Sequence, residues 1–367
     1  MKFSIVVAAY NVASYIGQCL ESLINQTYRN FEVIVINDAS TDNTLDEIYH
    51  AIGDDSRFSV VTMPINSGSH LVRKFGAAHA SGDWVLFVDG DDDLKNDALQ
   101  FLSESLHDTS ADIAYFGRDV IPQAKEDAAD ANVLEQGFNR NFGSLSGNEI
   151  IEAAFSDNEN RILWTVISIV VKREVVVAAF DKMTDSRMGR MQDAYEFLAL
   201  CSQSKECISL GKHLLNYEWG RGVTGSSHQN LDKFTQNVKD ILQVLQESAK
   251  FANQYGGKIC KQAVQWMALQ LPQHISTELI LRVNITLRQE AFLRFARIWG
   301  TDIAVGELNR LILEYAERER LSNGRDDSEL VQLMDIRGFL CMERFPNPSN
   351  LSVDNRHLDL LQSSADK

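Results

Sequence analysis

The sequence predicts an α/β protein with a doubly wound, mostly parallel sheet, followed by an all-helical C-terminal extension. Three observations lead to this fold class. Short apolar runs alternate four times with amphipathic helical patterns within about the first 90 residues, and the connections between them are short. Polar residues stand where each apolar run ends. From about residue 230 onward, strand patterns give way to helical ones.

The first apolar run, Phe3 to Ala9, is expected to form a strand that is buried on both faces. Asn11 is a residue type that caps helices, so we expect a helix to begin there. A stripe of apolar side chains at helical spacing follows it, formed by Ile16, Cys19, Leu20, Leu23 and Ile24. The same alternation then predicts strands over residues 31–36, 58–63 and 85–88, with one helix after residue 42 and another over 69–80.

The second half of the chain is expected to be helical. An amphipathic pattern covers residues 231–251, and further helical patterns cover 262–271, 279–299, 303–320 and 329–339. These patterns predict one domain over residues 1–229, a helical domain over 230–345 and a polar tail over 346–367.

The segment from Glu278 to Trp299 is open to more than one interpretation, because four arginines interleave with its apolar residues (Arg282, Arg288, Arg294 and Arg297). Such a helix could lie on a membrane surface and receive a lipid-linked acceptor. The interpretation that we favour is an ordinary core-packing helix whose arginines are solvated or paired at the surface. Formation of a homodimer through the helices is a third possibility.

Charge and cysteine usage narrow the class of protein. The formal net charge of −16 argues against a nucleic-acid-binding protein, which would present a basic face. The five cysteines are scattered without a C-x-x-C pair, which suits a reducing compartment and gives no cysteine-built zinc site. No apolar run approaches the roughly 20 residues of a transmembrane helix. We therefore expect a cytoplasmic protein, with peripheral contact at the inner face of the cell membrane as an option.

The densest polar feature is the carboxylate cluster of Asp89, Asp91, Asp92 and Asp93, which directly follows a buried strand. Carboxylates repel each other, so the cluster is either a solvated acidic turn or a site for a divalent cation. In a doubly wound sheet, ligands bind at the carboxyl ends of the strands. The other strand ends also carry polar side chains, namely Tyr10 and Asn11, Asn37 and Asp38, and Asn66. This pooling of polar groups favours a real binding site.

Several common site types are missing from the sequence. There is no G-x-G-x-x-G after a strand and no P-loop, so dinucleotide-fold and P-loop interpretations are excluded. An EF-hand over Asp89 to Asp93 fails because Leu94 stands at the glycine position and Gln100 at the glutamate position. Pyrophosphate would then have to be neutralised by a metal that carboxylates hold. This combination describes a nucleotide-sugar site.

The residues at the strand ends resemble the inverting glycosyltransferases of family 2, which have the GT-A fold. The resemblance covers residues 4–11 (SIVVAAYN), 22–27 (SLINQT), 32–42 (EVIVINDASTD) and the block from Asn66 through Arg73 to Asp92. The sequence departs from the family pattern at Ala9, where proline is usual, at Ala39, where glycine is usual, and at Lys74, where asparagine is usual. The resemblance weakens over residues 110–190 and does not cover the helical half.

The resemblance implies a donor site built from these strand ends. Ala9, Tyr10 and Asn11 would lie against the donor, with Tyr10 packed on the base. Asp38 would accept a hydrogen bond from the imide N–H of the base. Arg73 would pair with the acidic cluster or with phosphate, and a purely structural salt bridge is the alternative.

It also implies a division of roles within the cluster. Asp89 would hold the ribose or a metal-bound water, and Gly90 would line the donor site beside it. Asp91 would be the principal ligand of Mg²⁺ or Mn²⁺. Asp92 would either support the metal site from behind Asp91 or contact the acceptor.

The family resemblance returns at Gln192 and Asp193, where a Glu-Asp pair is usual at the start of a helix. It implies that Asp193 is the catalytic base and that Gln192 lies on the acceptor side. The alternative is that Asp193 only caps the helix. Arg221 ends a segment that resembles the family's aromatic segment, and the polar loop Thr224 to His228 would close over the donor through Gly220, Gly222 and Gly225. His228 would complete the metal coordination or remain unliganded.

The activity that this implies is a metal-dependent, inverting transfer of a sugar from a nucleotide-diphosphate donor, most simply a UDP-sugar, to a hydroxyl of a glycan or lipid-linked saccharide. Such enzymes build bacterial surface polysaccharides. One alternative is a sugar nucleotidyltransferase, which usually needs a glycine-rich loop after the first strand that Ala8 to Ala13 does not offer. The other is a non-catalytic nucleotide-sugar-binding or scaffold protein, against which the intact aspartates argue.

Overall fold

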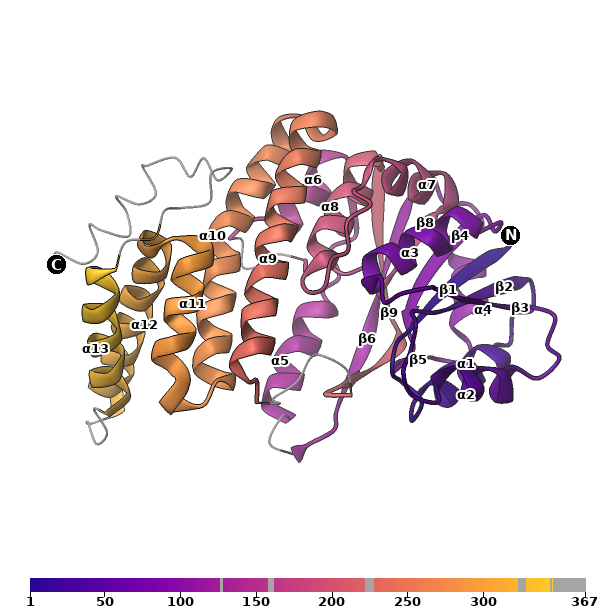
Figure 1. Ribbon diagram of the computed structural model, residues 1–367. Helices are drawn as coiled ribbons and strands as arrows, with labels where there is room; N and C mark the ends of the chain where they lie inside the picture. Colours follow the sequence, from indigo (N-terminus) through magenta and orange to yellow (C-terminus); the bar gives the residue numbers. More distant parts are fainter. Residues whose placement is uncertain (126–127, 158–161, 222–227, 323–327, 344, 346–367) are drawn as a thin grey trace. The chain divides into compact units, whose positions relative to one another are not determined.

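The computed structural model describes residues 1–125, 128–157, 162–221, 228–322, 328–343 and 345 (Figure 1). The chain divides into two compact units. The first consists of residues 1–225 together with 247–263, and the second of 226–246 together with 264 onward. The boundary therefore crosses two long helices, each of them once. The predicted domain limit at residue 229 stays a prediction.

The first unit is built on the alternation that the sequence predicts. Strands β1 (Phe3–Ala9), β2 (Phe31–Asn37), β3 (Phe58–Thr62) and β4 (Trp84–Asp89) pair in parallel in the order β3-β2-β1-β4. Helices α1 (Ile16–Ile24), α2 (Thr44–Ile52) and α3 (Gly68–His79) connect them. Strands β1 and β4 are apolar on both faces because helices cover both sides, and the predicted doubly wound sheet is confirmed here.

Beyond β4 the sheet becomes mixed. Strand β8 (Ile169–Lys172) pairs antiparallel with both β4 and β6 (Ile113–Pro122), and β6 pairs parallel with the long strand β9 (Glu206–Trp219). The short strands β5 (Asp93–Leu94) and β7 (Ser144–Ser146) pair antiparallel with β9. Helices α4 (Ala98–Ser105), α5 (Ala128–Phe138), α6 (Asn148–Ala154), α7 (Arg173–Lys182) and α8 (Gln192–Gln203) belong to this part.

The helices lie on opposite faces of the sheet, with α1 and α2 on one side and α3, α7 and α8 on the other (Figure 1). Helix α3 packs very closely on β1. A Cβ atom at Gly76 would stand 2.3 Å from Cγ1 of Val6, so this position admits only glycine without a shift of the helix. The close packing fixes where the side chains of α3 emerge at the carboxyl edge of the sheet.

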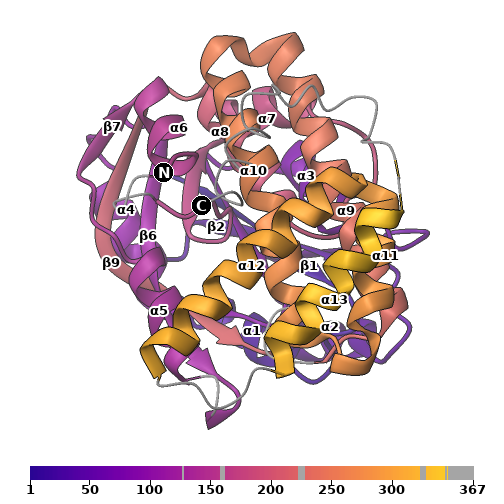
Figure 2. The same cartoon turned by 90° about the vertical axis from the view of Figure 1, so that its left-hand side faces the viewer.

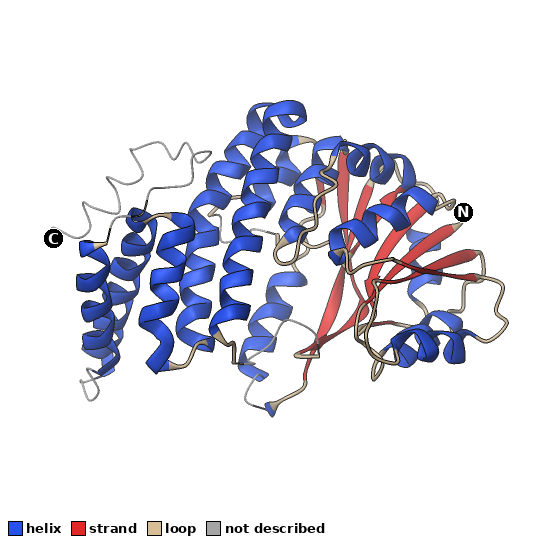
Figure 3. Cartoon of the chain, viewed as in Figure 1, coloured by secondary structure: helices blue, strands red, loops and turns tan. Residues whose placement is uncertain are grey.

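The helical part of the chain contains α9 (Leu231–Phe251), a π-helical turn (Ala252–Gly256), α10 (Gly257–Arg282), α11 (Arg288–Trp299), α12 (Thr301–Ser322) and α13 (Ser328–Met342) (Figure 3). Helices α11, α12 and α13 pack against one another (Figure 2). Trp299 is fully buried in the second unit, and its indole N–H donates to the carbonyl of Val238 over 3.2 Å. An all-helical C-terminal extension, as predicted, is confirmed.

Two local predictions are wrong. Asn11 does not cap α1: its backbone has φ +52°, and the helix begins five residues later at Ile16, after Tyr15. The predicted helix over 279–299 is broken, because α10 ends at Arg282 and a short 3₁₀ turn (Ile285–Leu287) precedes α11. Asn284 caps that turn by accepting from the amide of Thr286 over 3.0 Å.

Three of the four arginines of this segment form ion pairs with side chains of the second unit, and Arg297 lies over the ring of Phe345. Arg288 contacts Glu329 at 3.0 Å, and Arg294 contacts Glu290 at 2.9 Å. Arg282 lies 3.3 Å from Glu278, one turn back on its own helix. These contacts fit the interpretation of a core-packing helix with paired arginines. Among the described residues, no helix is long and apolar enough to cross a membrane.

Candidate active site

A cavity of about 370 Å³ lies at the carboxyl ends of β1, β2 and β4. Eight of the residues that line it were predicted from the sequence to bind the donor or the metal. The full lining is Ala8, Ala9, Tyr10, Asn11, Val12, Asp38, Ser69, Val72, Asp89, Gly90, Asp91, Tyr217 and Arg221. The structure therefore brings together strand ends that are up to about 80 residues apart in the first half of the chain.

The turn after β1 is shaped by Asn11, one of three described non-glycine residues with positive φ. Its side-chain oxygen accepts from the amide of Thr41 over 2.8 Å, and its own amide donates to the hydroxyl of Ser40 over 3.0 Å. These bonds stabilise a conformation that asparagine tolerates better than most residues. Tyr10, just before it, is 45% exposed and presents its ring at the cavity.

Asp38 is held by the start of α3. Its Oδ1 accepts from the amide of Ser67 over 2.7 Å, while Oδ2 accepts from the amide of Gly68 over 2.8 Å and from the side chain of Asn66 over 2.9 Å. Burial raises the pKa of Asp38, and the two amides oppose this shift. A carboxylate oxygen accepts two hydrogen bonds, so Oδ1 keeps one acceptor position.

The acidic cluster separates into structural and unpaired carboxylates. Asp93 is structural, because Gln18 and Asn216 each donate to one of its oxygens over 2.7 Å. Asp92 is buried, and its Oδ1 accepts from the amide of Glu218 over 3.0 Å. Its Oδ2 has no hydrogen-bond partner among the described residues, and burial beside Asp91 raises the pKa of Asp92 well above its usual value.

Asp91 points into a strongly acidic environment. Burial and the charge of Asp89 raise the pKa of Asp91 to about 6, and Arg221 opposes this shift. Arg221 itself lies 3.2 Å from Glu218 and stacks over Tyr15 at 5.0 Å from the ring centre. The carboxylate oxygens of Asp89 and Asp91 thus lie together at the cavity wall, and the nearby arginines neutralise their negative charge only in part.

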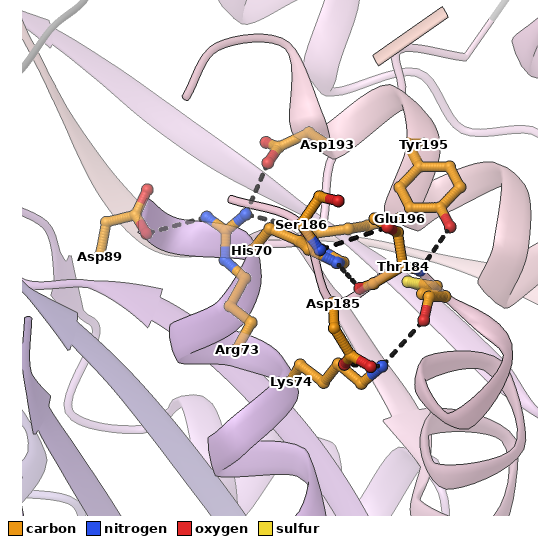
Figure 4. Close-up of polar contacts among 11 residues, drawn as sticks. His70, Arg73, Lys74, Asp89, Thr184, Asp185, Ser186, Asp193, Tyr195 and Glu196 are labelled. Atoms are coloured by element: carbon orange, nitrogen blue, oxygen red, sulfur yellow. Dashed lines mark hydrogen bonds and ion pairs between the residues drawn. The ribbon is translucent and has the colours of Figure 1, made fainter. Parts of the chain in front are cut away.

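Arg73 connects this cavity to a second carboxylate that the sequence singled out (Figure 4). Its Nη2 donates to Asp89 over 3.0 Å, and its Nη1 donates to Asp193 over 2.6 Å and to Glu196 over 2.9 Å. The arginine is 1% exposed, so these are buried, charge-assisted bonds. One guanidinium therefore fixes the spacing between the cavity wall and Asp193.

Asp193 lies in the first turn of α8, two residues after Met191, whose backbone has φ +63°. Its Oδ1 accepts from Arg73, whereas the side chain of Asp193 is 28% exposed. Burial and the neighbouring charges of Glu196 and Asp89 raise the pKa of Asp193, and Arg73 opposes this shift. The group thus combines a fixed orientation with a raised proton affinity.

Glu196 and His70 were not singled out from the sequence. Both are fully buried, and His70 Nδ1 lies 2.9 Å from Glu196 Oε1. A signal for them exists in helical spacing: His70 stands three residues before Arg73 on α3, and Glu196 three residues after Asp193 on α8. This spacing can be recognised in the sequence as two facing pairs of charged residues only when α3 and α8 are already known to be neighbours.

Five predicted site residues do not line the cavity: Arg73, Asp92, Asp193, His228 and Gln192, which begins α8. His228 is exposed and belongs to the second unit, so its role as a metal ligand stays a prediction. The predicted loop glycines Gly222 and Gly225, together with Thr224 and the tail 346–367, lie outside the described residues, while Gly220 is described.

A different group of possible metal ligands exists among the described residues, formed by Asp119, Glu135 and His213. Asp119 already contacts His213 Nδ1 at 2.5 Å and Lys95 at 2.6 Å. Because a lysine ammonium neutralises this carboxylate, the group is explained as an ion-pair network at the side of β6 and β9.

Comparisons with known proteins agree with this geometry. Residues 4–152 match the family model described as glycosyl transferase family 2. The chain is 36% identical over 113 residues to the glycosyltransferase GlyA of Streptococcus pneumoniae, which is 31% of this chain and 16% of that protein. It is 35% identical over 138 residues to the chondroitin synthase of Pasteurella multocida, which is 37% of this chain and 14% of that protein.

The chain thus spans only a small share of the length of these two relatives. Among solved structures, residues 1–349 of S. aureus TarS in complex with UDP-GlcNAc superpose with a TM-score of 0.60 at 16% identity, over 96% of this chain and 95% of that one. At this identity the likeness establishes the fold. Residues 4–152 therefore belong to glycosyl transferase family 2, on a GT-A fold that is followed by a helical C-terminal region.

Proposed function

We propose that the protein is a metal-dependent, inverting glycosyltransferase that moves a sugar from a UDP-sugar to a hydroxyl of a glycan or lipid-linked saccharide. One observation carries the proposal: the cavity at the strand ends and the carboxylate of Asp193 are joined by a single buried guanidinium, that of Arg73. A donor in the cavity and a base beside it are the two parts that a direct displacement needs.

The nucleoside would lie at the end of the cavity that Tyr10 and Asp38 form. Tyr10 offers an exposed aromatic face for stacking on a base. The remaining acceptor position on Asp38 Oδ1 suits an N–H donor such as the imide of uracil. Ala9, Asn11 and Gly90 would border the donor, and Arg221 would meet its phosphates.

The carboxylates fit Mg²⁺ or Mn²⁺, because Asp91 and Asp89 are oxygen donors whose mutual repulsion a divalent cation would relieve. Asp92 carries an orphaned oxygen beside them and would contribute through Asp91 or contact the acceptor. When bound, such a cation acts as a Lewis acid for the departing nucleoside diphosphate. Arg73 fixes the orientation of Asp89 in the absence of any ion.

Asp193 would take the proton from the acceptor hydroxyl. Its Oδ1 is held by Arg73, which leaves Oδ2 to approach the acceptor, and its raised pKa increases its strength as a base. The hydroxyl oxygen forms a bond to the anomeric carbon while the bond from that carbon to the diphosphate breaks. Attack from the face opposite the leaving group inverts the configuration in one step.

The named relatives support the choice of donor and of product class. TarS was crystallised with UDP-GlcNAc and with UDP, and one matched relative is a chondroitin synthase. We therefore propose a polysaccharide or a related glycan of a bacterial surface as the product. We further propose a cytoplasmic site for the reaction, which agrees with the free cysteines of the described chain.

The experiment is a panel of nucleotide sugars incubated with the full-length protein and Mn²⁺ or Mg²⁺, with donor hydrolysis and transfer as readouts. Asp193→Asn should lower turnover by about 1,000-fold while donor affinity stays within about threefold, because the base acts only in the chemical step. A scaffold would bind a donor without turnover. A nucleotidyltransferase would instead consume a nucleoside triphosphate and a sugar phosphate. Unchanged turnover in Asp193→Asn would contradict the proposed base.

A further inference from the structure

His70 occupies a fully buried position on α3, one helical turn before Arg73. Its Nδ1 lies 2.9 Å from Oε1 of Glu196, and its Nε2 lies 3.0 Å from the carbonyl oxygen of Thr184 (Figure 4). Both ring nitrogens are therefore within hydrogen-bond distance of an oxygen.

The chemistry of these two oxygens determines the protonation of the ring. A peptide carbonyl only accepts hydrogen bonds, and an ionised carboxylate also only accepts. A neutral imidazole has one N–H donor and one acceptor nitrogen, so it can satisfy only one of the two contacts. Either the ring is an imidazolium or Glu196 is a carboxylic acid. Arg73 donates to the other oxygen of Glu196 over 2.9 Å, which favours the ionised carboxylate and therefore the imidazolium.

The surroundings hold the ring in this orientation. The backbone at Thr184 is itself held in place, because its amide donates to the hydroxyl oxygen of Tyr195 over 3.0 Å. Lys74 donates to the carbonyl of Met183 over 2.8 Å and pairs with Asp185 at 2.7 Å, so the same segment is tied to α3. Phe180 stacks on the imidazole at 6.1 Å between ring centres.

The charged and titratable groups that face His70 come from every element around it. Glu196 and Tyr195 approach from α8, and Arg73 lies on its own helix. Asp185 acts on it electrostatically from the segment after α7. Two carboxylates and one guanidinium thus stand near the ring, and among them only Glu196 is hydrogen-bonded to it.

We propose that His70 is a positioning residue for the transfer reaction: as a doubly hydrogen-bonded imidazolium, it fixes Glu196, which in turn fixes the guanidinium of Arg73 against Asp193. The proposal rests on the proposed function, because it assigns to this chain of contacts the orientation of the expected base.

The sequence of contacts explains why the base would depend on a residue that it does not touch. Arg73 Nη1 is shared between Asp193 at 2.6 Å and Glu196 at 2.9 Å. If Glu196 loses its partner, it is free to change its position, and the shared nitrogen loses one of its two anchors. Asp193 would then be oriented by a less constrained Nη1, whereas Asp89 at the cavity wall would keep its bond to the other nitrogen, Nη2.

Two substitutions distinguish the roles of the two ring nitrogens of His70. The amide nitrogen of an asparagine occupies the position of histidine Nδ1, and that of a glutamine occupies the position of Nε2. His70→Asn should therefore keep the bond to Glu196 and retain turnover within about threefold of the parent. His70→Gln should keep only the bond to Thr184 and lose about 10- to 100-fold in kcat, with the donor Kd within about threefold.

His79 provides a matched control on the same helix. It is exposed, and its Nδ1 contacts the carbonyl of Phe75 in its own helix at 2.8 Å. His79→Asn and His79→Gln should leave kcat unchanged. Equal losses in His70→Asn and His70→Gln, or full activity in His70→Gln, would overturn the proposal, because a purely structural role would not distinguish the two nitrogens.

The protonation state is tested independently in the parent protein by NMR of ¹⁵N-labelled histidine at pH 7.5, with His70→Asn identifying the signal. Two protonated ring nitrogens support the proposal even if His70→Gln fails to fold, and a neutral ring overturns it. If the parent protein transfers sugar from no donor in the panel, the proposed function fails, and the NMR result still decides the state of His70.

Discussion

A single guanidinium carries the charge balance at the core of the candidate active site. Arg73 contacts three carboxylates at 3.0 Å or less, those of Asp89, Asp193 and Glu196, while being almost completely buried. Removing one partner from such a buried group leaves uncompensated charge, which costs several kcal/mol. The arrangement is therefore both a structural element and a means of holding two functional carboxylates at a fixed separation.

Asp91 yields a prediction at the residue scale, because its pKa is raised to about 6 by burial and by Asp89. A carboxylate whose folded pKa exceeds its unfolded pKa destabilises the fold when ionised. This penalty is fully present above pH 6, shrinks as the pH falls toward 4, and is absent below it. Asp91→Asn should therefore raise the free energy of unfolding of the metal-free protein by about 2 kcal/mol at pH 7.5, and the gain should vanish near pH 4.

Urea unfolding of both proteins across this pH range, with EDTA present, measures the effect. Addition of Mn²⁺ should raise the Tm of the parent protein and leave that of Asp91→Asn unchanged, because the variant lacks the expected principal ligand. Asp54→Asn, at an exposed position, is the control and should behave like the parent. A metal-free Asp91→Asn protein that is less stable than the parent at pH 7.5 would contradict the prediction.

At the residue scale, the aspartates of the site could be predicted from the sequence, whereas the buried residues that hold them could not. Asp38, Asp89 and Asp91 stand at strand ends, so the alternation of strands and helices was enough to bring them together. His70 and Glu196 lie within helices that the sequence does not show to be neighbours. Their pairing is a tertiary contact across about 126 positions of chain, which periodicity does not encode.

At the scale of elements, the turns after β1 and β2 form one rim of the cavity and both contain a residue with positive φ. In the turn after β2 that residue is Ala39, with φ +56°. This conformation costs an L-amino acid roughly 1–2 kcal/mol, whereas glycine adopts it freely but loses about 0.5–1 kcal/mol through unfolded-state entropy. The backbone therefore explains why glycine is usual at this position in the family that the sequence resembles.

Ala39→Gly should increase the free energy of unfolding by about 0.5 kcal/mol. The same substitution at Ala78, an exposed position inside α3, should decrease it by about 0.5–1 kcal/mol, since glycine is a poor helix former. The difference between the two variants in urea unfolding is the readout. Equal destabilisation by both would show that Ala39 is not strained by its backbone.

The elements that were predicted are those with strong periodicity. Strands β1 and β4 are continuous apolar runs with almost no exposure, and α1 has a clear apolar stripe. Strand β9 was missed because its burial alternates irregularly over 14 residues and it pairs with three other strands. The break between α10 and α11 was missed because apolar residues continue through it, and only the cap at Asn284 marks it.

At the scale of the molecule, the first compact unit includes a segment that the sequence assigned to the helical extension. Residues 247–263 belong to this unit, although α9 begins in the second unit and α10 ends in it. Phe251 is 2% exposed and makes an edge contact with Tyr195 of α8, at 6.0 Å between ring centres. Periodicity identifies this stretch as helical, but it does not reveal which body a helix completes.

Helix α8 carries Asp193 and Glu196, so the segment that covers it should matter for catalysis. Phe251→Ala should lower the free energy of unfolding by about 3 kcal/mol and kcat by about tenfold, with donor affinity retained.

Phe234→Ala is the matched control: the same substitution at an equally buried position of the same helix α9, but in the second unit. It should destabilise to a similar extent and leave kcat of the folded protein unchanged. Thermal unfolding together with kcat and donor Kd, measured well below the Tm of each variant, separates the two effects. If the effect is confined to α8, only Phe251→Ala should lower kcat. Equal loss of kcat in both variants would therefore contradict the prediction and mean that catalysis also depends on the second unit.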